Sequence, residues 1–179
     1  MVDVIAAAMH APFASYEQAT KFLEDTVARA DVKHLSYWYL RMSDGVPDDV
    51  VWVATYDPAY MSHYMSTYTP MGDPVIEGTI DEDRVIDWSE WINADGVSHK
   101  IYEVAKNYGL TRWGISIPFK SDDGGAVLFS VCIDCAEEDW TQMRSVLATR
   151  FRPFAHDFHA RMRPLLLSQQ KGQTLLTYE

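Results

Sequence analysis

The sequence predicts an α+β fold in which helices cover both faces of an antiparallel sheet. Three observations predict this fold class: an amphipathic helix near the start, two segments typical of β-hairpins, and a long amphipathic helix near the end. With 179 residues, 47% of them hydrophobic and 23% charged, the chain has the size and composition of one globular domain. The start MVDVIAAAMHAPF lacks the features of a secretory signal, and no run of about 18 apolar residues occurs. We therefore expect a cytoplasmic protein without a membrane span.

The first helix and the first hairpin are expected in the N-terminal third of the chain. From Ser15 to about Ala30 apolar residues recur at helical spacing, and Ser15 with Gln18 has the form of a capping box. His34 to Met42 and Val50 to Thr55 are rich in β-forming residues, and the Ser-Asp-Gly and Pro-Asp-Asp between them are typical of turns. These two runs predict a hairpin.

Two further helices and a second hairpin are expected in the middle of the chain. Asp57 to Thr67 predicts a short helix, which Thr69-Pro70-Met71-Gly72 would end, and Gly96 to Tyr108 predicts another. Arg112 to Phe119 alternates, and Ala126 to Asp134 returns as a strand after a Ser-Asp-Asp-Gly-Gly loop. One face of the last strand would be large and apolar, whereas the other would be small and mildly polar, as a ligand wall is: Val127, Phe129, Val131 and Ile133 against Ala126, Leu128, Ser130 and Cys132.

The C-terminal segment from Glu137 to about Leu167 predicts a long amphipathic helix, because its apolar residues follow one another in steps of three or four. We expect Pro153 to kink this helix and Pro164 to end it. The chain then divides into one domain, residues 1–167, and a polar tail, residues 168–179, with the character of the start of a linker.

Composition and spacing exclude several functions. The net charge of −11 and the scattered Lys and Arg residues argue against DNA binding by this chain alone. Cys132 and Cys135 lack a second pair that would complete a zinc site, so we expect buried thiols. His156 and His159 form an H-x-x-H without a third ligand and are expected to be solvated. Ser130 lacks a G-x-S-x-G motif, so no catalytic residue, metal or cofactor is expected.

The central segment is aromatic and carries few charges. Tyr56, Tyr60 and Tyr64 are four residues apart, and on a helix beginning near Asp57 the last two share one face. Such a stripe is usually core or interface. Three phenol hydroxyls near one carboxylate, Asp73, nevertheless exceed the polarity that packing requires. A packed core and a ligand site both stay open at this point.

Three motifs add a family resemblance. TYDPAYMSHYMSTYTPMGDPVI contains a tyrosine, an aromatic residue, a second tyrosine and Asp-Pro in an order that resembles the LuxR family of quorum-sensing regulators. Trp88 follows where that family has tryptophan, and YGLTRWGISIPFK and GGAVLFSVCID resemble the next two strands. The similarity covers roughly residues 15–170 and concerns the N-terminal autoinducer-binding domain. It implies an α-β-α sandwich with an antiparallel sheet of about five strands that encloses an acyl-homoserine lactone or a related signal.

The resemblance implies roles for individual residues. Asp73 resembles the aspartate that accepts the amide N–H of the lactone signal, and Tyr56 matches the tyrosine that donates to the acyl carbonyl. Ser130 matches the residue that adds a second polar contact there. Further matches are residues that wall the cavity and one glycine where the chain packs closely: Tyr64, Trp88, Leu40, Val75 and Gly114.

Three aromatic residues depart from the family pattern. Tyr60 stands where the family usually has a tryptophan that donates to the lactone carbonyl, and a phenol donates along a different vector. Lactone recognition is then retained, altered or directed to another headgroup. Trp38 and Trp52 lie on strands whose inward residues line the acyl tail in the family. We expect both to be ligand-binding and to shorten or flatten the tail channel, which would favour short or aromatic acyl groups.

Together these observations predict a ligand-binding sensor domain of a LuxR-type transcriptional regulator that is not an enzyme. The resemblance implies a homodimer, which binds DNA only through a C-terminal helix-turn-helix domain that lies outside this chain. Three alternatives stay open. One is a similar sensor for a non-lactone small molecule, another is an acyl enzyme that modifies the signal, and the third is a protein-interaction module, which would need no interior cavity.

Overall fold

The computed structural model describes residues 11–68, 72–81, 84–92 and 96–175. The strands form one five-stranded antiparallel sheet in the order β2-β1-β5-β4-β3. The predicted α+β class is therefore confirmed. The elements follow in the order α1 (Tyr16–Ala30), β1 (His34–Ser43), β2 (Val46–Ala54), α2 (Pro58–Thr67), α3 (Pro74–Asp81), β3 (Ile86–Asp87), α4 (Trp88–Ile92), α5 (Val97–Ala105), η2 (Lys106–Tyr108), β4 (Gly114–Lys120), β5 (Ala126–Cys132) and α6 (Glu137–Leu175).

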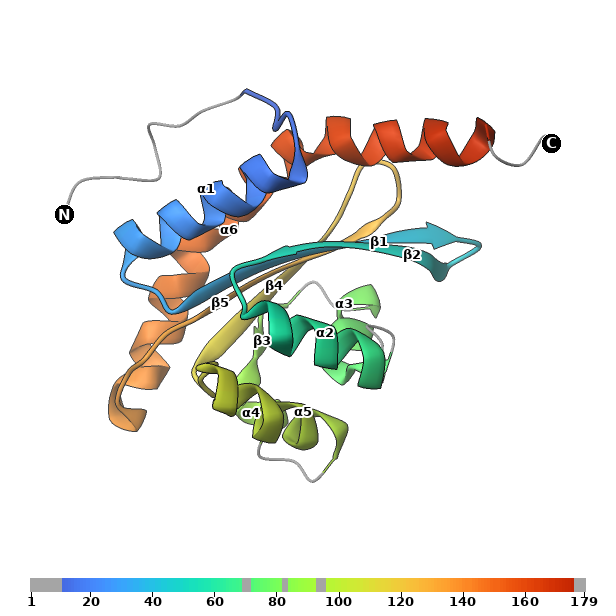
Figure 1. The fold of residues 1–179 in the computed structure, drawn as a ribbon. Helices are drawn as coiled ribbons and strands as arrows, with labels where there is room; N and C mark the ends of the chain where they lie inside the picture. The colour runs from blue at the N-terminus through green and yellow to red at the C-terminus, as the bar shows by residue number, and fades with distance from the viewer. Residues whose placement is uncertain (1–10, 69–71, 82–83, 93–95, 176–179) are drawn as a thin grey trace.

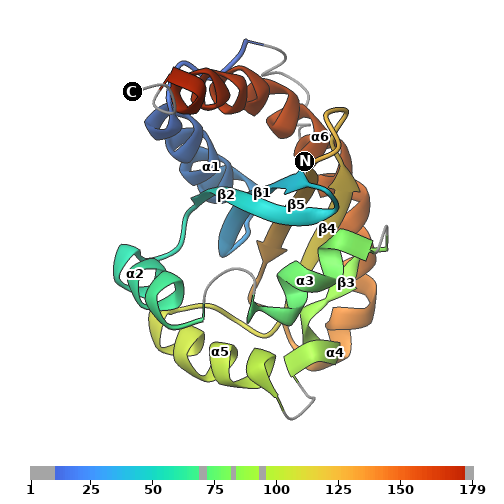
Figure 2. The same cartoon turned by 90° about the vertical axis from the view of Figure 1, so that its right-hand side faces the viewer.

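Helices cover both faces of the sheet and make three layers. Figure 1 shows α1 and α6 together on one side of the strands, and Figure 2 shows α2, α3, α4 and α5 on the other side. This arrangement is the predicted α-β-α sandwich. Among the described residues, no helix combines the length and the apolar character needed to cross a membrane.

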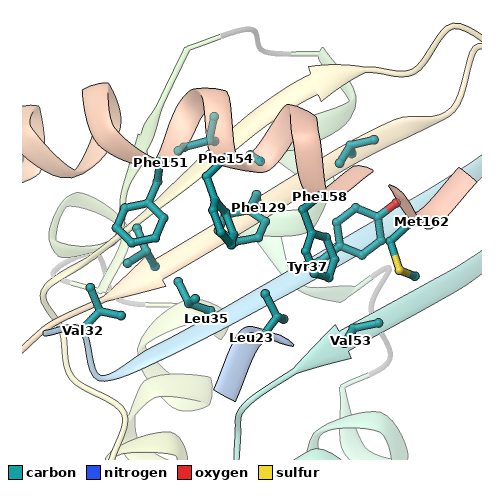
Figure 3. Close-up of a cluster of buried hydrophobic side chains, with 14 of the residues drawn as sticks. Leu23, Val32, Leu35, Tyr37, Val53, Phe129, Phe151, Phe154, Phe158 and Met162 are labelled. Carbon is teal, nitrogen blue, oxygen red and sulfur yellow. The ribbon is translucent and has the colours of Figure 1, made fainter. Parts of the chain in front are cut away.

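The face under α1 and α6 carries a core rich in phenylalanine (Figure 3). The rings of Phe129 and Phe154 lie 5.4 Å apart, and those of Tyr37 and Phe158 lie 5.2 Å apart. The predicted division of β5 is confirmed, because Val127, Phe129, Val131 and Ile133 belong to this core. Ala126 and Leu128 belong to a second cluster on the opposite face.

The first helix and both hairpins are confirmed, with one correction. Ser15 Oγ accepts a hydrogen bond from the Gln18 backbone N–H at 3.2 Å, as a capping residue does. The turn of the first hairpin lies at Asp44 and Gly45, which have φ of 51° and 80°, and β2 already begins at Val46. The Pro-Asp-Asp that we predicted as a turn is therefore part of a strand. Pro47 is tolerated there because β2 is an edge strand with a register shift nearby.

The prediction that Pro164 ends the last helix is wrong, because α6 continues to Leu175. Met162 and Leu166 are both buried against the core, so apolar packing continues past the proline and offsets the hydrogen bond that it removes. Figure 1 shows that α6 bends along its length. The proposed boundary after residue 167 lies inside this helix and stays a prediction.

Three short elements between α2 and α5 were not predicted: α3, β3 and α4. The sequence analysis placed Asp73-Pro74 directly after the predicted break at residues 69–72 and assigned no helix to it. In the structure it starts α3, with Asp73 as the residue before the helix and Pro74 in its first turn. The helices α3 and α4 lie on the face of the sheet that holds the site described below, and β3 is the edge strand beside β4 (Figure 2).

Candidate ligand-binding site

A cavity of about 90 Å³ lies between the sheet and the helices α2 to α5. Most of its wall surface is apolar, but the lining also includes nine residues that carry a hydroxyl and one carboxylate. Of the ten residues predicted to bind a ligand, eight line it: Trp38, Tyr56, Tyr60, Tyr64, Asp73, Val75, Trp88 and Ser130.

Leu40 and Trp52 do not belong to this lining. Leu40 is fully buried in the apolar cluster on the same face of the sheet. Trp52 is 36% exposed on the edge strand β2, where it pairs with Trp38 on β1, and the two indoles lie 6.1 Å apart. Of the two tryptophans expected to shape a tail channel, only Trp38 reaches the cavity.

Asp73 is held in place by two hydrogen bonds. Its Oδ1 accepts the Val75 backbone N–H at 2.9 Å, and its Oδ2 accepts the Tyr64 hydroxyl at 2.8 Å. Burial raises the pKa of Asp73, although both hydrogen bonds act in the opposite direction. A carboxylate offers about four acceptor positions, so capacity for a ligand donor is left at the cavity wall.

Three serines form a row across the sheet wall of the cavity. Ser36 on β1 pairs with Ser130 on β5, and Ser130 pairs with Ser116 on β4, so all three lie at one level of the sheet. Ser116 Oγ and Ser130 Oγ are 2.8 Å apart. The sequence analysis named only Ser130. The alternation of Ser36 and Ser116 with buried apolar neighbours was a usable signal, but their alignment depends on strand pairing.

Three aromatic residues are fixed by this row, and one of them is Trp38, whose indole N–H donates to Ser36 Oγ at 3.3 Å. Ser36 Oγ lies 3.0 Å from the hydroxyl of Tyr56, and burial raises the pKa of that phenol well above its usual value. The Trp88 indole N–H donates to Ser116 Oγ at 2.8 Å. A Cβ atom on Gly114 would collide with the Trp88 indole, which explains why the chain has glycine there. The close packing expected at Gly114 is therefore present.

Tyr60 lies at the centre of an aromatic cluster and is only 4% exposed. Its ring centroid is 5.9 Å from that of Tyr56, 6.0 Å from that of Tyr64 and 5.7 Å from that of Tyr108. Burial raises the pKa of Tyr60, so its hydroxyl keeps the proton at neutral pH. Tyr60 lines the cavity, so its phenol can donate to a ligand there.

The residues of α5 that line the cavity, which we call the α5 wall, were not predicted to bind a ligand. Ser98, Ile101 and Ala105 are buried on one face of α5 and all line the cavity, and Trp91 on α4 lies beside them in the lining. Their spacing of three and four residues is the usual helical stripe. In the sequence it predicts only a buried face, and not which cavity that face meets.

His159 corrects the expectation of solvated histidines. It is 7% exposed, its Nδ1 lies 2.8 Å from the Tyr37 hydroxyl, and its Nε2 lies 2.9 Å from Ser121 Oγ. Burial lowers its pKa to about 4, so the ring is neutral at pH 7. Within the ranges that the structure describes, no group of three or more His, Cys, Asp or Glu residues is placed to hold a metal ion.

The two cysteines are both free thiols. Cys132 is buried as expected, and burial raises its pKa to about 12. Cys135 is only partly buried. A thiol with a raised pKa is protonated at neutral pH and a poor nucleophile.

A mostly apolar, largely preformed cavity with a few fixed polar groups defines a small-molecule-binding domain. Residues 15–162 match the family model described as autoinducer binding domain. The chain therefore belongs to the autoinducer-binding-domain family and is a ligand-binding sensor domain of the LuxR type.

Solved structures of LuxR-type proteins share this fold. CepR2 from Burkholderia cenocepacia, described as an N-acylhomoserine lactone dependent LuxR family transcription factor, is 18% identical with a TM-score of 0.66, over 92% of both chains. SdiA in complex with octanoyl-rac-glycerol is 15% identical with a TM-score of 0.61, over 86% of this chain and 61% of SdiA. Another crystal structure, of Escherichia coli SdiA, is 14% identical with a TM-score of 0.61. None of the curated proteins is a significant match.

Proposed function

We propose that the cavity binds an acyl-homoserine lactone and that the domain performs no chemistry on it. The observation that carries this proposal is Asp73, a buried carboxylate on the cavity wall that two hydrogen bonds hold in place and that can accept more. A buried carboxylate is costly unless it is hydrogen-bonded, and an amide N–H of the ligand would offset that cost. The description of CepR2 as dependent on N-acylhomoserine lactone supports the same ligand class.

The polar groups of the wall suit the rest of such a ligand. Ser130 belongs to the serine row, and Tyr56 is hydrogen-bonded to that row through Ser36. Both hydroxyls would donate to the acyl carbonyl. Trp38 and Leu128 offer apolar surface beside them. Burial of the ligand's apolar atoms would supply most of the affinity, whereas the hydrogen bonds would fix its orientation.

The lining does not support an acyl-transfer enzyme. Among the described lining residues there is no histidine or cysteine, and Ser130 Oγ is paired with Ser116 Oγ. A serine nucleophile needs an adjacent base to activate it. We therefore propose a binding protein, in which the ligand stabilises the folded state by about 2.7 kcal/mol at a concentration a hundredfold above Kd.

The sensor is proposed to act in the cytoplasm as a homodimer, within a LuxR-type regulator whose C-terminal helix-turn-helix domain binds DNA. The chain spans 61% of the SdiA chain, which supports a longer protein of this kind. Residues 1–167 would form the sensor and residues 168–179 the start of the connection.

A non-lactone ligand is the second candidate. Tyr60 stands where the LuxR family usually has a tryptophan, and it lines the cavity, so its hydroxyl can donate to a different headgroup. SdiA has been crystallised with octanoyl-rac-glycerol, which has no lactone ring.

The test is thermal melting of the chain against acyl-homoserine lactones with short, long and aryl tails, together with monoacylglycerols. We expect a concentration-dependent rise in Tm for one subset of lactones, because the ligand binds only the folded state. Asp73→Ala should abolish the rise.

Asp123→Ala is the matched control for Asp73→Ala. Asp123 also accepts a tyrosine hydroxyl, from Tyr39 at 3.0 Å, and a backbone N–H, from Gly125 at 3.1 Å, but it does not line the cavity. This variant should keep the ligand response. A rise with monoacylglycerols alone would favour the second candidate, and a flat panel would contradict binding of either class.

A further inference from the structure

Ser98 carries a buried hydroxyl that nothing in the protein satisfies. The residue is 8% exposed, and its Oγ has no hydrogen-bond partner among the described residues. An unpaired buried polar group costs free energy, so such groups are uncommon in folded proteins. Ser98 lines the ligand cavity, which means that the missing partner can be a bound molecule.

The position of Ser98 in the cavity indicates which part of a ligand it would meet. It lies on the buried stripe of α5 with Ile101 and Ala105, and the neighbouring α4 adds Trp91 and Ile92 to the lining. Trp38 enters the cavity from β1, the strand expected to face the acyl tail. Ser98 belongs to the α4 and α5 side of the cavity. If the acyl tail lies against β1, the headgroup lies on this other side.

Ser98 and Tyr60 contact the α4 and α5 side of the cavity at different positions along α5. Tyr60 packs against Tyr108, which follows α5 at its C-terminal end, whereas Ser98 is the second residue of α5. Because an α-helix rises about 1.5 Å per residue, Ser98 and Ala105 are separated by roughly 10 Å along the axis. The Tyr60 ring and Ser98 thus lie toward opposite ends of the part of the cavity wall that α5 forms.

We propose that Ser98 is a specificity residue that donates a hydrogen bond to an oxygen of the ligand's headgroup. The inference rests on the proposed function and adds that recognition comes from α5 as well as from α2. Tyr60 stands where the LuxR family usually has a tryptophan donor, and Ser98 would be a second donor to the headgroup beside it. A ligand whose headgroup has no oxygen would leave the Ser98 hydroxyl buried and unpaired.

Matched ligands test this proposal. The probes are one N-acyl-homoserine lactone that raises the Tm and the N-acyl-cyclopentylamide with the same acyl chain, which keeps the amide and the ring size but lacks both lactone oxygens. Dissociation constants are measured by calorimetry for the wild-type chain, Ser98→Ala, Ser98→Thr and Ile101→Val. We expect Ser98→Ala to reduce the preference for the lactone over the cyclopentylamide about two- to tenfold, the usual range for one hydrogen bond.

The controls separate a lost hydrogen bond from a damaged cavity. Ser98→Thr keeps the hydroxyl and should retain the preference, and Ile101→Val should weaken both ligands alike. Without ligand, Ser98→Ala should melt at the same temperature as the wild type or higher, because it removes an unpaired polar group.

Each contrary outcome has a distinct meaning. An unchanged lactone preference in Ser98→Ala, or a wild-type chain that binds both probes equally, overturns the role of Ser98 and leaves the proposed function intact. A wild-type chain that binds neither lactones nor cyclopentylamides contradicts the proposed function itself and removes the basis for this inference.

Discussion

The face of the sheet under α1 and α6 differs from the face under α2 to α5 in how it is filled, because the first carries a close-packed core and the second encloses a cavity of about 90 Å³. On the first face, both ring nitrogens of His159 have hydroxyl partners among close-packed phenylalanine rings. On the second face, the hydroxyl of Ser98 has no partner among the described residues, and Asp73 has acceptor capacity to spare. We call the close-packed cluster of buried residues under α1 and α6, which includes Phe129, Phe154 and Phe158, the finished core.

This difference indicates how the domain divides stability and sensing. Apolar packing on the first face can hold the sheet and both outer helices without help from a ligand. The second face has polar groups that a ligand would satisfy and space that it would fill. Ligand binding therefore completes the second core, and occupancy of the cavity becomes folding stability.

The largest expected effect comes from breaking the finished core. Phe158 is fully buried and contacts the rings of Phe13, Tyr37 and Phe129. Phe158→Ala should lower the free energy of unfolding by about 3–5 kcal/mol, measured by urea denaturation without ligand. Ile101→Ala on the cavity wall should cost only about 2 kcal/mol, because its side chain already borders open space. Equal losses would mean that the two faces are equally well packed.

A change of pH should act on the same finished core through His159. Its pKa is lowered to about 4 in the folded state, whereas an unfolded histidine titrates near 6.5. The stability that this implies is fully present above about pH 6.5 and is lost as pH falls toward 4, by up to about 3 kcal/mol. Urea midpoints between pH 7 and pH 5 measure this slope.

His159→Gln should reduce that slope without removing it. Burial also lowers the pKa of His34 and of His156, and both residues contribute in the same direction. Asp73 contributes in the opposite direction, because its raised pKa favours the folded state as pH falls. A slope unaffected by His159→Gln would show that this histidine does not titrate between the folded and unfolded states as the structure implies.

Sequence reasoning identified both faces because β5 alternates cleanly between large apolar and small polar residues. It did not identify β3 and α4, which are only 2 and 5 residues long and have no periodicity of their own. Tertiary contacts hold them: Asp87 accepts the Trp140 indole N–H at 3.1 Å and pairs with Arg144 at 2.6 Å. Contacts between residues more than 50 positions apart leave no local pattern.

The candidate site, like the fold, was predictable from the sequence only in part. The motif around Tyr56 and Asp73 identified the residues on α2 and at the start of α3. Ser36, Ser116 and Ser98 were not identified, because strand register and the placement of α5 bring them to the cavity. Trp52 was misplaced for a related reason, since β2 is the edge strand and leaves its indole 36% exposed.

Each face has one glycine whose replacement by alanine should lower stability by an intermediate amount. A Cβ on Gly114 would collide with Trp88 at the cavity, and a Cβ on Gly125 would collide with Tyr39, which belongs to the finished core. Gly114→Ala and Gly125→Ala should each cost about 1–3 kcal/mol in urea denaturation, because a ring must move. Only Gly114→Ala should also remove the ligand-induced rise in Tm. Loss of the rise in both variants would show that the faces are coupled.

The smallest effects are expected from removing one hydroxyl on each face. Tyr37→Phe deletes a partner of His159, and Tyr64→Phe deletes the donor to Asp73. Each should cost about 1 kcal/mol without ligand, the usual net contribution of one hydrogen bond. Tyr64→Phe should also change the Kd for ligand, because Asp73 loses a contact that holds it and lowers its pKa, whereas Tyr37→Phe should leave Kd unchanged. If calorimetry finds the same change of Kd for both variants, the phenol of Tyr64 acts through overall stability, and the division between a structural face and a sensing face fails at that residue.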